Sequence, residues 1–467
     1  MGLVVGENRD VEGIFDRSSV AVVGAGPAGV TAARALAALG HHVVLLFRPR
    51  RFGAAEGVSE RAAEALRLAG CDEALDILGP ALPRVSSWNG RSTPSGSEYL
   101  VDRIRFDEAM RRGAARIGVA CVEGHCDGWQ EGEHGCRLFV RPKGVATFAS
   151  EIAFVVDARG RAGSINRASS VRGAATTALS RSWTARRTPR GSALASFARG
   201  WCWLAAPEGS SAFLQLFVSS GRNDSPLRDC LEDAYEALLR EVPEACDWLD
   251  NATPSSPVHA RDATSILPGS VVSPRSLRVG DGAFAVDPLS GQGLFEAIAT
   301  ALAAAPVVNT LLRRAAAGAL AKEFYRERIE DTFLRLARAG RDAYRAEQRW
   351  HDEPFWNERR AWPDDEPARR PAGPATVRSV AVSEDGFIVS RPAIVTPDHP
   401  RGVWRLDSVE LVPLLEFAVA HRSERDEDLV NRYAELSATP SASVARALEW
   451  LRRRGLVETS TPRAPRI

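Results

Sequence analysis

Three glycines near the N-terminus have the spacing of a phosphate-binding turn. Gly24, Gly26 and Gly29 follow the apolar run 20–23 and precede a helical pattern over 30–39. In a G-x-G-x-x-G turn, the first glycine permits the bend, the second admits a pyrophosphate, and the third lets helix and strand pack closely. The helix N-terminus adds free N–H groups for phosphate oxygens. The pattern predicts a dinucleotide site, and the alternative is a plain turn in an α/β protein.

A second glycine-rich segment lies far along the chain and carries a carboxylate. Asp281 follows a short strand pattern over 277–279, and a Pro-x-x-Gly-x-Gly turn at 288–293 precedes a long apolar helix. A carboxylate at this position can accept hydrogen bonds from the hydroxyl groups of a ligand. A helix that begins near Leu294 directs the positive end of its dipole toward the turn. The alternative is a glycine-rich loop that binds no cofactor.

With these two motifs in this order, the sequence resembles the flavoprotein monooxygenases of the aromatic-hydroxylase and tryptophan-halogenase superfamily. The resemblance implies FAD as the cofactor, with Asp281 on the ribityl chain and the 288–294 segment against the isoalloxazine ring. It also implies that Arg103, within the segment 100–108, contacts the flavin at the start of a helix. Without the resemblance, that segment would be an amphipathic helix with solvated charges.

The resemblance gives a set of candidate residues and one departure from the family pattern. The second strand of such FAD domains usually ends in an acid that holds the adenosine ribose, whereas this chain has Phe47 and then Arg48. Adenosine binding must therefore rely on other groups. Glu56 matches a Gly-Glu-Ser position of the halogenase branch and is the candidate catalytic residue, with a surface loop acid as the alternative. The candidate cofactor-binding residues are Gly24, Gly26, Ala28, Gly29, Arg48, Arg103, Asp281, Pro288, Gly291, Gln292, Gly293 and Leu294.

Two further segments are similar to the halogenase branch, but the lysine content argues against halogenation. The segments are 156–161 and 200–207, and the second contains Trp201 and Trp203, which could equally fill a core. Halogen transfer in that branch needs a lysine near the substrate, and arginine does not substitute for it. The chain has only Lys143 and Lys322. We therefore expect oxygen transfer rather than chlorine transfer.

The segments 344–350 and 354–360 resemble a narrower branch, the flavoproteins that modify tryptophan in the biogenesis of the cysteine tryptophylquinone of quinohemoprotein amine dehydrogenase. The resemblance implies an FAD-dependent monooxygenase that hydroxylates a tryptophan side chain of a partner polypeptide, the small subunit of that dehydrogenase. Reduced flavin or NAD(P)H would supply the electrons. The alternatives are a flavin-dependent halogenase, a small-molecule aromatic hydroxylase, a flavin reductase or desaturase, and a flavin-binding regulator that acts on DNA.

The elements that must position these residues predict an α/β fold. We expect a Rossmann-like FAD domain, an inserted β-sheet substrate domain and a C-terminal helical, winged-helix-like module. Alternating residues in the inserted domain predict a strand over 213–218 that is covered on most of both faces. The expected boundaries are 1–170 and 269–362 for the FAD domain, 171–268 for the insertion, 363–402 for a proline-rich connector and 403–467 for the module.

Composition and charge restrict the partners and the location. The chain has 60 Lys plus Arg and 59 Asp plus Glu. The resulting net charge of +1 argues against a nucleic-acid partner. The seven cysteines and eight histidines lack metal-ligand spacing, so no metal site is expected. The first eighteen residues lack the apolar region of a signal peptide. The apolar stretch 293–312 contains polar residues and a proline, which predicts a buried helix and no membrane span. We therefore expect a cytoplasmic protein.

Overall fold

The computed structural model describes residues 11–163, 169–185, 188–220 and 230–457. The chain divides into two compact units. Unit 1 comprises Met1–Gly318 and Tyr325–Ala368, and unit 2 comprises Ala319–Phe324 and Arg369–Ile467. Each unit has a core of its own and is described separately.

The first layer of unit 1 is a mainly parallel sheet whose two central strands, Val20–Val23 and Val43–Phe47, are short and fully apolar. Such strands form because helices and other strands cover both faces, so no residue needs to be polar. The strands follow the order β18-β9-β1-β2-β6-β7-β8, and the first five are parallel. Their bounds are β1 (Val20–Val23), β2 (Val43–Phe47), β6 (Ala120–Glu131), β9 (Phe154–Asp157) and β18 (Ser276–Arg278). This is the expected Rossmann-like arrangement.

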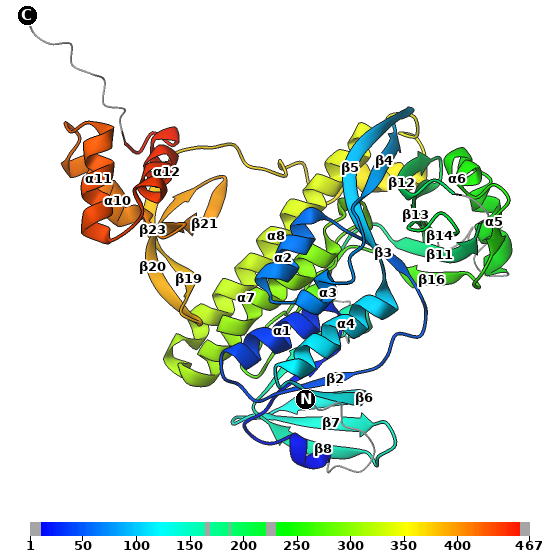
Figure 1. Ribbon diagram of the computed structural model, residues 1–467, viewed down its shortest axis with the longest axis horizontal. Helices are drawn as coiled ribbons and strands as arrows, with labels where there is room; N and C mark the ends of the chain where they lie inside the picture. The colour runs from blue at the N-terminus through cyan, green and yellow to red at the C-terminus, as the bar shows by residue number, and fades with distance from the viewer. Residues whose placement is uncertain (1–10, 164–168, 186–187, 221–229, 458–467) are drawn as a thin grey trace, which may run out of the picture. The chain divides into compact units, whose positions relative to one another are not determined.

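Helices and an antiparallel meander accompany the parallel sheet (Figure 1). Beyond its parallel half, β6 pairs with β7 (Cys136–Pro142), which pairs with β8 (Phe148–Ile152), both antiparallel. The apolar side chains of this meander pack against those of β1 and β2. The helices are α1 (Pro27–Ala38), α2 (Glu60–Leu68), α3 (Asp72–Leu75), α4 (Arg103–Arg116) and α7 (Gly293–Arg313).

Helix α7 is long and apolar enough to cross a membrane by length and composition alone, but 67% of its most apolar window is buried inside the fold. Ile298, Ala301 and Val308 have at most 1% of their surface exposed, and α7 packs along α1. The helix therefore forms part of the core of unit 1, as the polar residues within it predict.

The second layer of unit 1 is a nine-stranded sheet with two differently covered faces. Its main path is β15-β11-β14-β13-β12-β4-β5-β3, and β16 pairs with β11. Helices α5 (Leu231–Leu239) and α6 (Pro243–Trp248) cover one face (Figure 1), and the core between them and the sheet contains aliphatic side chains together with Trp183, Phe197 and Tyr235. The strands are β3 (Ala55–Val58), β4 (Leu82–Trp88), β5 (Arg91–Asp102), β11 (Thr176–Thr184), β12 (Gly191–Phe197), β13 (Gly200–Ala206), β14 (Ser211–Ser219), β15 (Thr253–Pro254) and β16 (His259–Asp262). A small separate pair is β10 (Val171–Arg172) with β17 (Ile266–Leu267).

The other face of this sheet meets an aromatic cluster from the end of unit 1. Helices α8 (Gly318–Ala346) and α9 (Pro354–Arg360) contribute Tyr344, Phe355 and Trp356 to this cluster. Trp356 is fully buried, and its indole Nε1 donates to the carbonyl oxygen of Phe197 at 3.0 Å. The segments 344–350 and 354–360, which resemble the narrower branch in sequence, therefore help to cover this face of the nine-stranded sheet.

Unit 2 corrects one prediction from the sequence. The segment 363–402 does not run as an extended connector, because it contains the three-stranded antiparallel sheet of β19 (Thr376–Glu384), β20 (Phe387–Thr396) and β21 (His399–Val403). Asp385 and Gly386 both have positive φ, which suits the tight turn between β19 and β20. Prolines suggested a connector, yet they are tolerated in edge strands and turns.

Three C-terminal helices lie within the segment 403–467, where the sequence predicts a helical module. They are α10 (Leu411–Ala420), α11 (Asp426–Ser437) and α12 (Ser441–Arg453), preceded by the short pair β22 (Arg405–Leu406) and β23 (Val409–Glu410). Leu411, Leu414, Val444 and Leu451 are fully buried in one core that also includes Ile394 of β20. The sheet and the helices therefore form one unit.

Candidate functional site

The glycine turn after β1 has the shape that a dinucleotide requires. Gly24 has φ +108°, and a Cβ there would collide with the carbonyl oxygen of Ala158. A Cβ on Gly29 would overlap the carbonyl oxygen of Gly24, so only glycine lets α1 pack this closely on the turn. A Cβ on Gly26 would meet no atom within 4 Å. The turn is therefore tight on the protein side and open where a phosphate would approach.

The two glycine-rich motifs, which are distant in sequence, come into contact at Ala28. A Cβ on Gly280, which has φ +59°, would lie 2.8 Å from the Cβ of Ala28. Gly280 also donates its N–H to the hydroxyl of Thr300 on α7 at 2.9 Å. The close approach brings Asp281 to the same edge of the parallel sheet as the glycine turn, as the sequence predicts.

Asp281 lies deep in unit 1 and still faces open space. Burial raises the pKa of its carboxyl group, and the positive charge of Arg161 opposes that rise. Arg161 Nε lies 3.3 Å from Asp281 Oδ2, yet 47% of the Asp281 side chain is accessible. A carboxylate that is surrounded by protein but remains accessible lines an interior space. That position suits hydrogen bonds to a ligand hydroxyl.

Arg103 and Glu56 form an ion pair at the same space. Arg103 begins α4, donates to Glu56 Oε2 and lies 2.9 Å from Asp107 Oδ1. Only 13% of the Arg103 side chain is exposed, against 32% of that of Glu56. Asp102 caps the helix by accepting from the backbone N–H of Arg105 at 2.9 Å. Glu56 is thus a salt-bridged residue beside the site and not an isolated surface acid.

Two more arginines, absent from the sequence-based candidates, join Arg103. Arg50 follows β2 and lies 3.2 Å from Asp107 Oδ2. Arg261 lies on β16, where partial burial and the positive charges of Arg50 and Arg103 lower its pKa. We refer to Arg50, Arg103 and Arg261 as the arginine cluster. Arg50 and Arg103 share Asp107 as an ion-pair partner, and Arg103 also pairs with Glu56, so the three guanidinium groups are only partly neutralised by these carboxylates.

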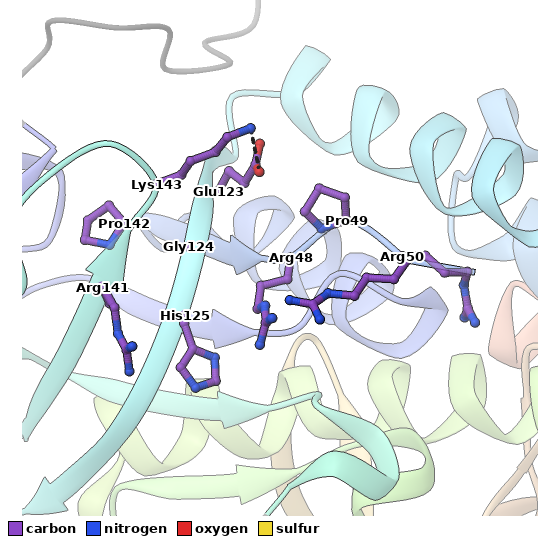
Figure 2. Close-up of a pocket in the computed structure, with 10 residues that line it drawn as sticks. Arg48, Pro49, Arg50, Glu123, Gly124, His125, Arg141, Pro142 and Lys143 are labelled. Atoms are coloured by element: carbon purple, nitrogen blue, oxygen red, sulfur yellow. Dashed lines mark ion pairs between the residues drawn. The ribbon is translucent and has the colours of Figure 1, made fainter. Parts of the chain in front are cut away.

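Arg48 lies in a basic pocket beside the end of β2. The pocket has a volume of about 610 Å³. Figure 2 shows Arg48 and Arg50 from the loop after β2 beside His125, while Lys143 pairs with Glu123 at 2.9 Å. The lining residues are Arg48, Pro49, Arg50, Arg51, Glu123, Gly124, His125, Arg141, Pro142 and Lys143. The lining is mainly basic, and its acid, Glu123, is the partner of Lys143.

The turn before α7 is fixed to the nine-stranded sheet by a chain of hydrogen bonds. Asp287 Oδ1 accepts from the N–H of Leu289 at 3.0 Å, and its Oδ2 accepts from the hydroxyl of Tyr344 at 2.9 Å. The same hydroxyl accepts from Trp201 Nε1 at 3.0 Å. Burial raises the pKa of Asp287 and of Tyr344 above their ordinary values. The chain holds the turn over the sheet.

The remaining predicted residues form this turn and the beginning of the helix. Pro288 starts a short 3-10 turn, Gly291 has φ +61°, and α7 begins at Gly293. Leu294 is 6% exposed. The side-chain oxygen of Gln292 accepts from Arg61 Nη1 at 3.4 Å. A Cβ on Gly293 would meet no atom within 4 Å, so the helix N-terminus has open space before it.

The face of the nine-stranded sheet that meets this turn is polar and aromatic, and we call it the inner face. Strand register places Trp203 beside Leu194 of β12 and Gln215 of β14, and Arg84 beside Ser192. Trp201 stacks on Phe217 with ring centroids 3.9 Å apart. Trp201 is 2% exposed, as the core-filling alternative predicts, but Trp203 is only partly buried.

No separate signal in the sequence marks Arg50, Arg84 or Arg261, because their positions depend on tertiary structure. Within residues 11–163, 169–185, 188–220 and 230–457, no group of three His, Cys, Asp or Glu side chains is arranged to hold a metal ion. The same part of the chain contains no disulfide, since all seven cysteines are free.

Comparisons with known proteins place this geometry in context. No family model and no curated protein matches the chain. Among solved structures, a peptidyl tryptophan dihydroxylase, QhpG, described as essential for tryptophylquinone cofactor biogenesis, is 36% identical with a TM-score of 0.80, and the match covers 94% of this chain and 100% of that one. The flavin-dependent halogenase CmlS is 19% identical with a TM-score of 0.71 and coverages of 94% and 95%. The myxobacterial FAD-dependent halogenase CndH is 23% identical with a TM-score of 0.63 and coverages of 74% and 86%. The two halogenases share the fold.

Proposed function

The chain belongs to the FAD-dependent monooxygenase family that includes the peptidyl tryptophan dihydroxylase QhpG, and from this premise we propose that it hydroxylates a tryptophan side chain in a partner polypeptide. The observation that carries the proposal is 36% identity along the whole length of QhpG. We propose that the modified tryptophan becomes part of a tryptophylquinone cofactor. The small subunit of a quinohemoprotein amine dehydrogenase is the proposed partner, and reduced flavin or NAD(P)H the proposed source of electrons.

The proposed cofactor contacts follow from the shape and charge of the site. FAD, when bound, supplies the oxygen activation that no amino-acid side chain provides. The open side of Gly26 and the arginine cluster would hold its pyrophosphate, and Asp281 would accept from its ribityl hydroxyls. The N-terminus of α7, beyond Gly293, would direct its positive dipole end at the ring system. The basic pocket around Arg48 would receive the adenosine end.

The protein's own task is to place the aromatic ring and exclude water. The inner face offers aromatic and polar side chains opposite the turn at Gly291, and Trp203 and Gln215 remain partly accessible there. An indole could stack on such a surface, since aromatic pairs gain about 0.5–1.5 kcal/mol beyond the area they bury. Halogen transfer is disfavoured, because the chain has no lysine among its first 142 residues.

The test is the oxygenation of a tryptophan within a polypeptide. The full-length protein, FAD, NAD(P)H or chemically reduced flavin, and ¹⁸O₂ would be incubated with the small subunit and, separately, with free tryptophan. We expect one or more ¹⁸O atoms on the polypeptide's tryptophan by mass spectrometry, little product from free tryptophan, and no effect of chloride. Equal oxidation of free tryptophan, or a chlorine isotope pattern, would contradict the proposal.

A further inference from the structure

The inner face contains a buried carboxylate that has no role in the contacts described so far. Glu98 lies on β5 and is only 7% exposed. Its Oε1 accepts from the hydroxyl of Ser192 and from Trp203 Nε1, the latter at 3.3 Å. Among the residues that the structure describes, no cation pairs with it. Burying a carboxylate without a cation is costly, so the position needs a reason beyond stability.

The second oxygen of this carboxylate lies against β3, on the face of that strand opposite to the Glu56 side chain, because successive residues of a strand point to opposite faces. A Cβ on Gly57 would overlap Glu98 Oε2, so the glycine makes room for that oxygen. Gly57 is adjacent in β3 to Glu56, which pairs with Arg103 at the proposed flavin site. The carboxylate is thus held through one oxygen, while the other reaches the strand that borders the cofactor space.

The neighbouring guanidinium on the same face also lacks a protein partner. Arg84 is aligned with Ser192 in the parallel pair of β4 and β12. Its Nε is buried and, in the described part of the chain, makes no hydrogen bond. Its Nη1 lies 3.9 Å from the position that a Cβ on Gly291 would occupy. Arg84 therefore borders the space between the inner face and the turn at Gly291, and Glu98 lies on the same face, where it accepts from Ser192, the residue aligned with Arg84.

We propose that Glu98 is a catalytic base in this reaction and receives the proton that leaves the aromatic ring, while Arg84 binds an oxygen atom of the substrate or of the reacting oxygen. The inference rests on the proposed function. One oxygen atom of O₂, activated at the flavin, bonds to a ring carbon whose C–H bond breaks. The proton passes to Glu98, and the C–H electron pair restores aromaticity. The other oxygen atom leaves as water, with two electrons from NAD(P)H or another flavin reductant.

The experiment compares Glu98→Gln and Glu98→Asp with the wild type on whichever ring the wild type oxygenates, whether a tryptophan polypeptide, free indole or a phenol. Glu241→Gln is the matched control, because Glu241 is 37% exposed and pairs with Arg199 away from the inner face. FAD content, oxygen uptake, hydrogen peroxide and product are measured with protiated and ring-deuterated substrate. If only a small aromatic ring is oxygenated, the polypeptide proposal fails while the role of Glu98 is still tested.

We expect Glu98→Gln to retain FAD and oxygen uptake, to release peroxide, and to form product about 100-fold more slowly. Deuteration should slow that variant and not the wild type, because loss of the base makes C–H cleavage limiting. Glu98→Asp should recover part of the rate. A Glu98→Gln enzyme with the wild-type product rate would overturn the proposal. So would equal loss of FAD and product in the Gln and Asp variants, which indicates a purely structural carboxylate.

Discussion

The cofactor end of unit 1 and the inner face of its nine-stranded sheet are built in different ways. At the cofactor end, Gly24, Gly29 and Gly280 lie so close to neighbouring atoms that a side chain at any of these three positions would collide. On the inner face, side chains such as Trp201, Trp203 and Glu98 form the surface. A site whose shape depends on such close contacts tolerates few substitutions, but its residues do not indicate which substrate the protein binds. A site made of side chains is adjustable, and it is where relatives with the same fold can differ in chemistry.

The largest expected effect sharpens this contrast at Gly29. Gly29→Val places a branched side chain against the carbonyl of Gly24, and we expect a loss of at least ~4 kcal/mol in the free energy of unfolding. Little folded, FAD-containing protein should be recovered, as measured by absorbance and circular dichroism. Gly318→Ala is the control, since a Cβ there meets only Leu311 Cδ2 at 3.5 Å. Normal yield of the Gly29→Val protein would contradict the close packing.

The second largest expected effect is a pH-dependent loss of stability at Glu347, which accepts from Ser196 of the inner face. Burial alone would raise the pKa of Glu347, but hydrogen bonds from Arg349, Ser196 and the backbone of Asn89 lower it to about 2. Because the folded pKa lies below the ordinary 4.5, this stabilisation is present above pH 4.5 and is lost as the pH falls toward 2.

Glu347→Gln should therefore lower the free energy of unfolding by on the order of 3 kcal/mol at neutral pH, with the difference from wild type vanishing in acid. Denaturant titrations at several pH values measure this difference. A difference that stays constant with pH would show that the charge of Glu347 is not the cause.

A third prediction returns to the cofactor end. Asp281→Ala removes a carboxylate that could accept charge-assisted hydrogen bonds, each contributing about 1.5–3 kcal/mol, so FAD affinity should fall about 10- to 100-fold. Equilibrium dialysis measures the affinity, and Asp247→Ala serves as the control because Asp247 is exposed on α6, away from the proposed FAD contacts. Full flavin stoichiometry at low FAD concentration would exclude the proposed ribityl contact.

The smallest expected effect is at Tyr344, whose hydroxyl joins the turn before α7 to the inner face. Tyr344→Phe removes the hydroxyl between Trp201 Nε1 and Asp287 Oδ2, leaving both partly unsatisfied, at a cost of about 1–3 kcal/mol in stability. We expect FAD content to be retained and peroxide release to rise relative to product, because the turn before α7 is no longer fixed to the sheet. An unchanged ratio of product to peroxide would mean that the hydrogen bond only stabilises the fold.

The sequence predicts the cofactor end better than the inner face for a physical reason. The glycine turn is local, since Gly24, Gly26 and Gly29 lie within one strand–turn–helix unit, and Gly24 and Gly29 have steric requirements that only glycine meets. Alternation over 213–218 also predicts the two covered faces of β14. By contrast, Glu98 and Ser192 lie 94 positions apart and meet only through the pairing of β4 with β5 and β12.

The arginine cluster is likewise difficult to predict from the sequence. Arg50, Arg103 and Arg261 come from a loop, a helix and a strand, and an arginine-rich sequence makes any one of them inconspicuous. The connector prediction for 363–402 failed because proline content was weighed above the strand pattern of 376–384 and 387–396. Composition reports average behaviour, whereas a hairpin needs only a suitable turn and a few apolar residues in register.

The repulsion within the arginine cluster also has a thermodynamic consequence for the protein in the cell. An anion that binds only the folded chain raises its free energy of unfolding by RT ln(1 + [ligand]/Kd), about 2.7 kcal/mol at a hundredfold excess over Kd. Part of that gain here would be the relief of charges that the empty site forces together. The nucleotide would then act as a folding ligand as well as a reagent. The supply of flavin would set how much of the polypeptide survives proteolysis, before any turnover begins.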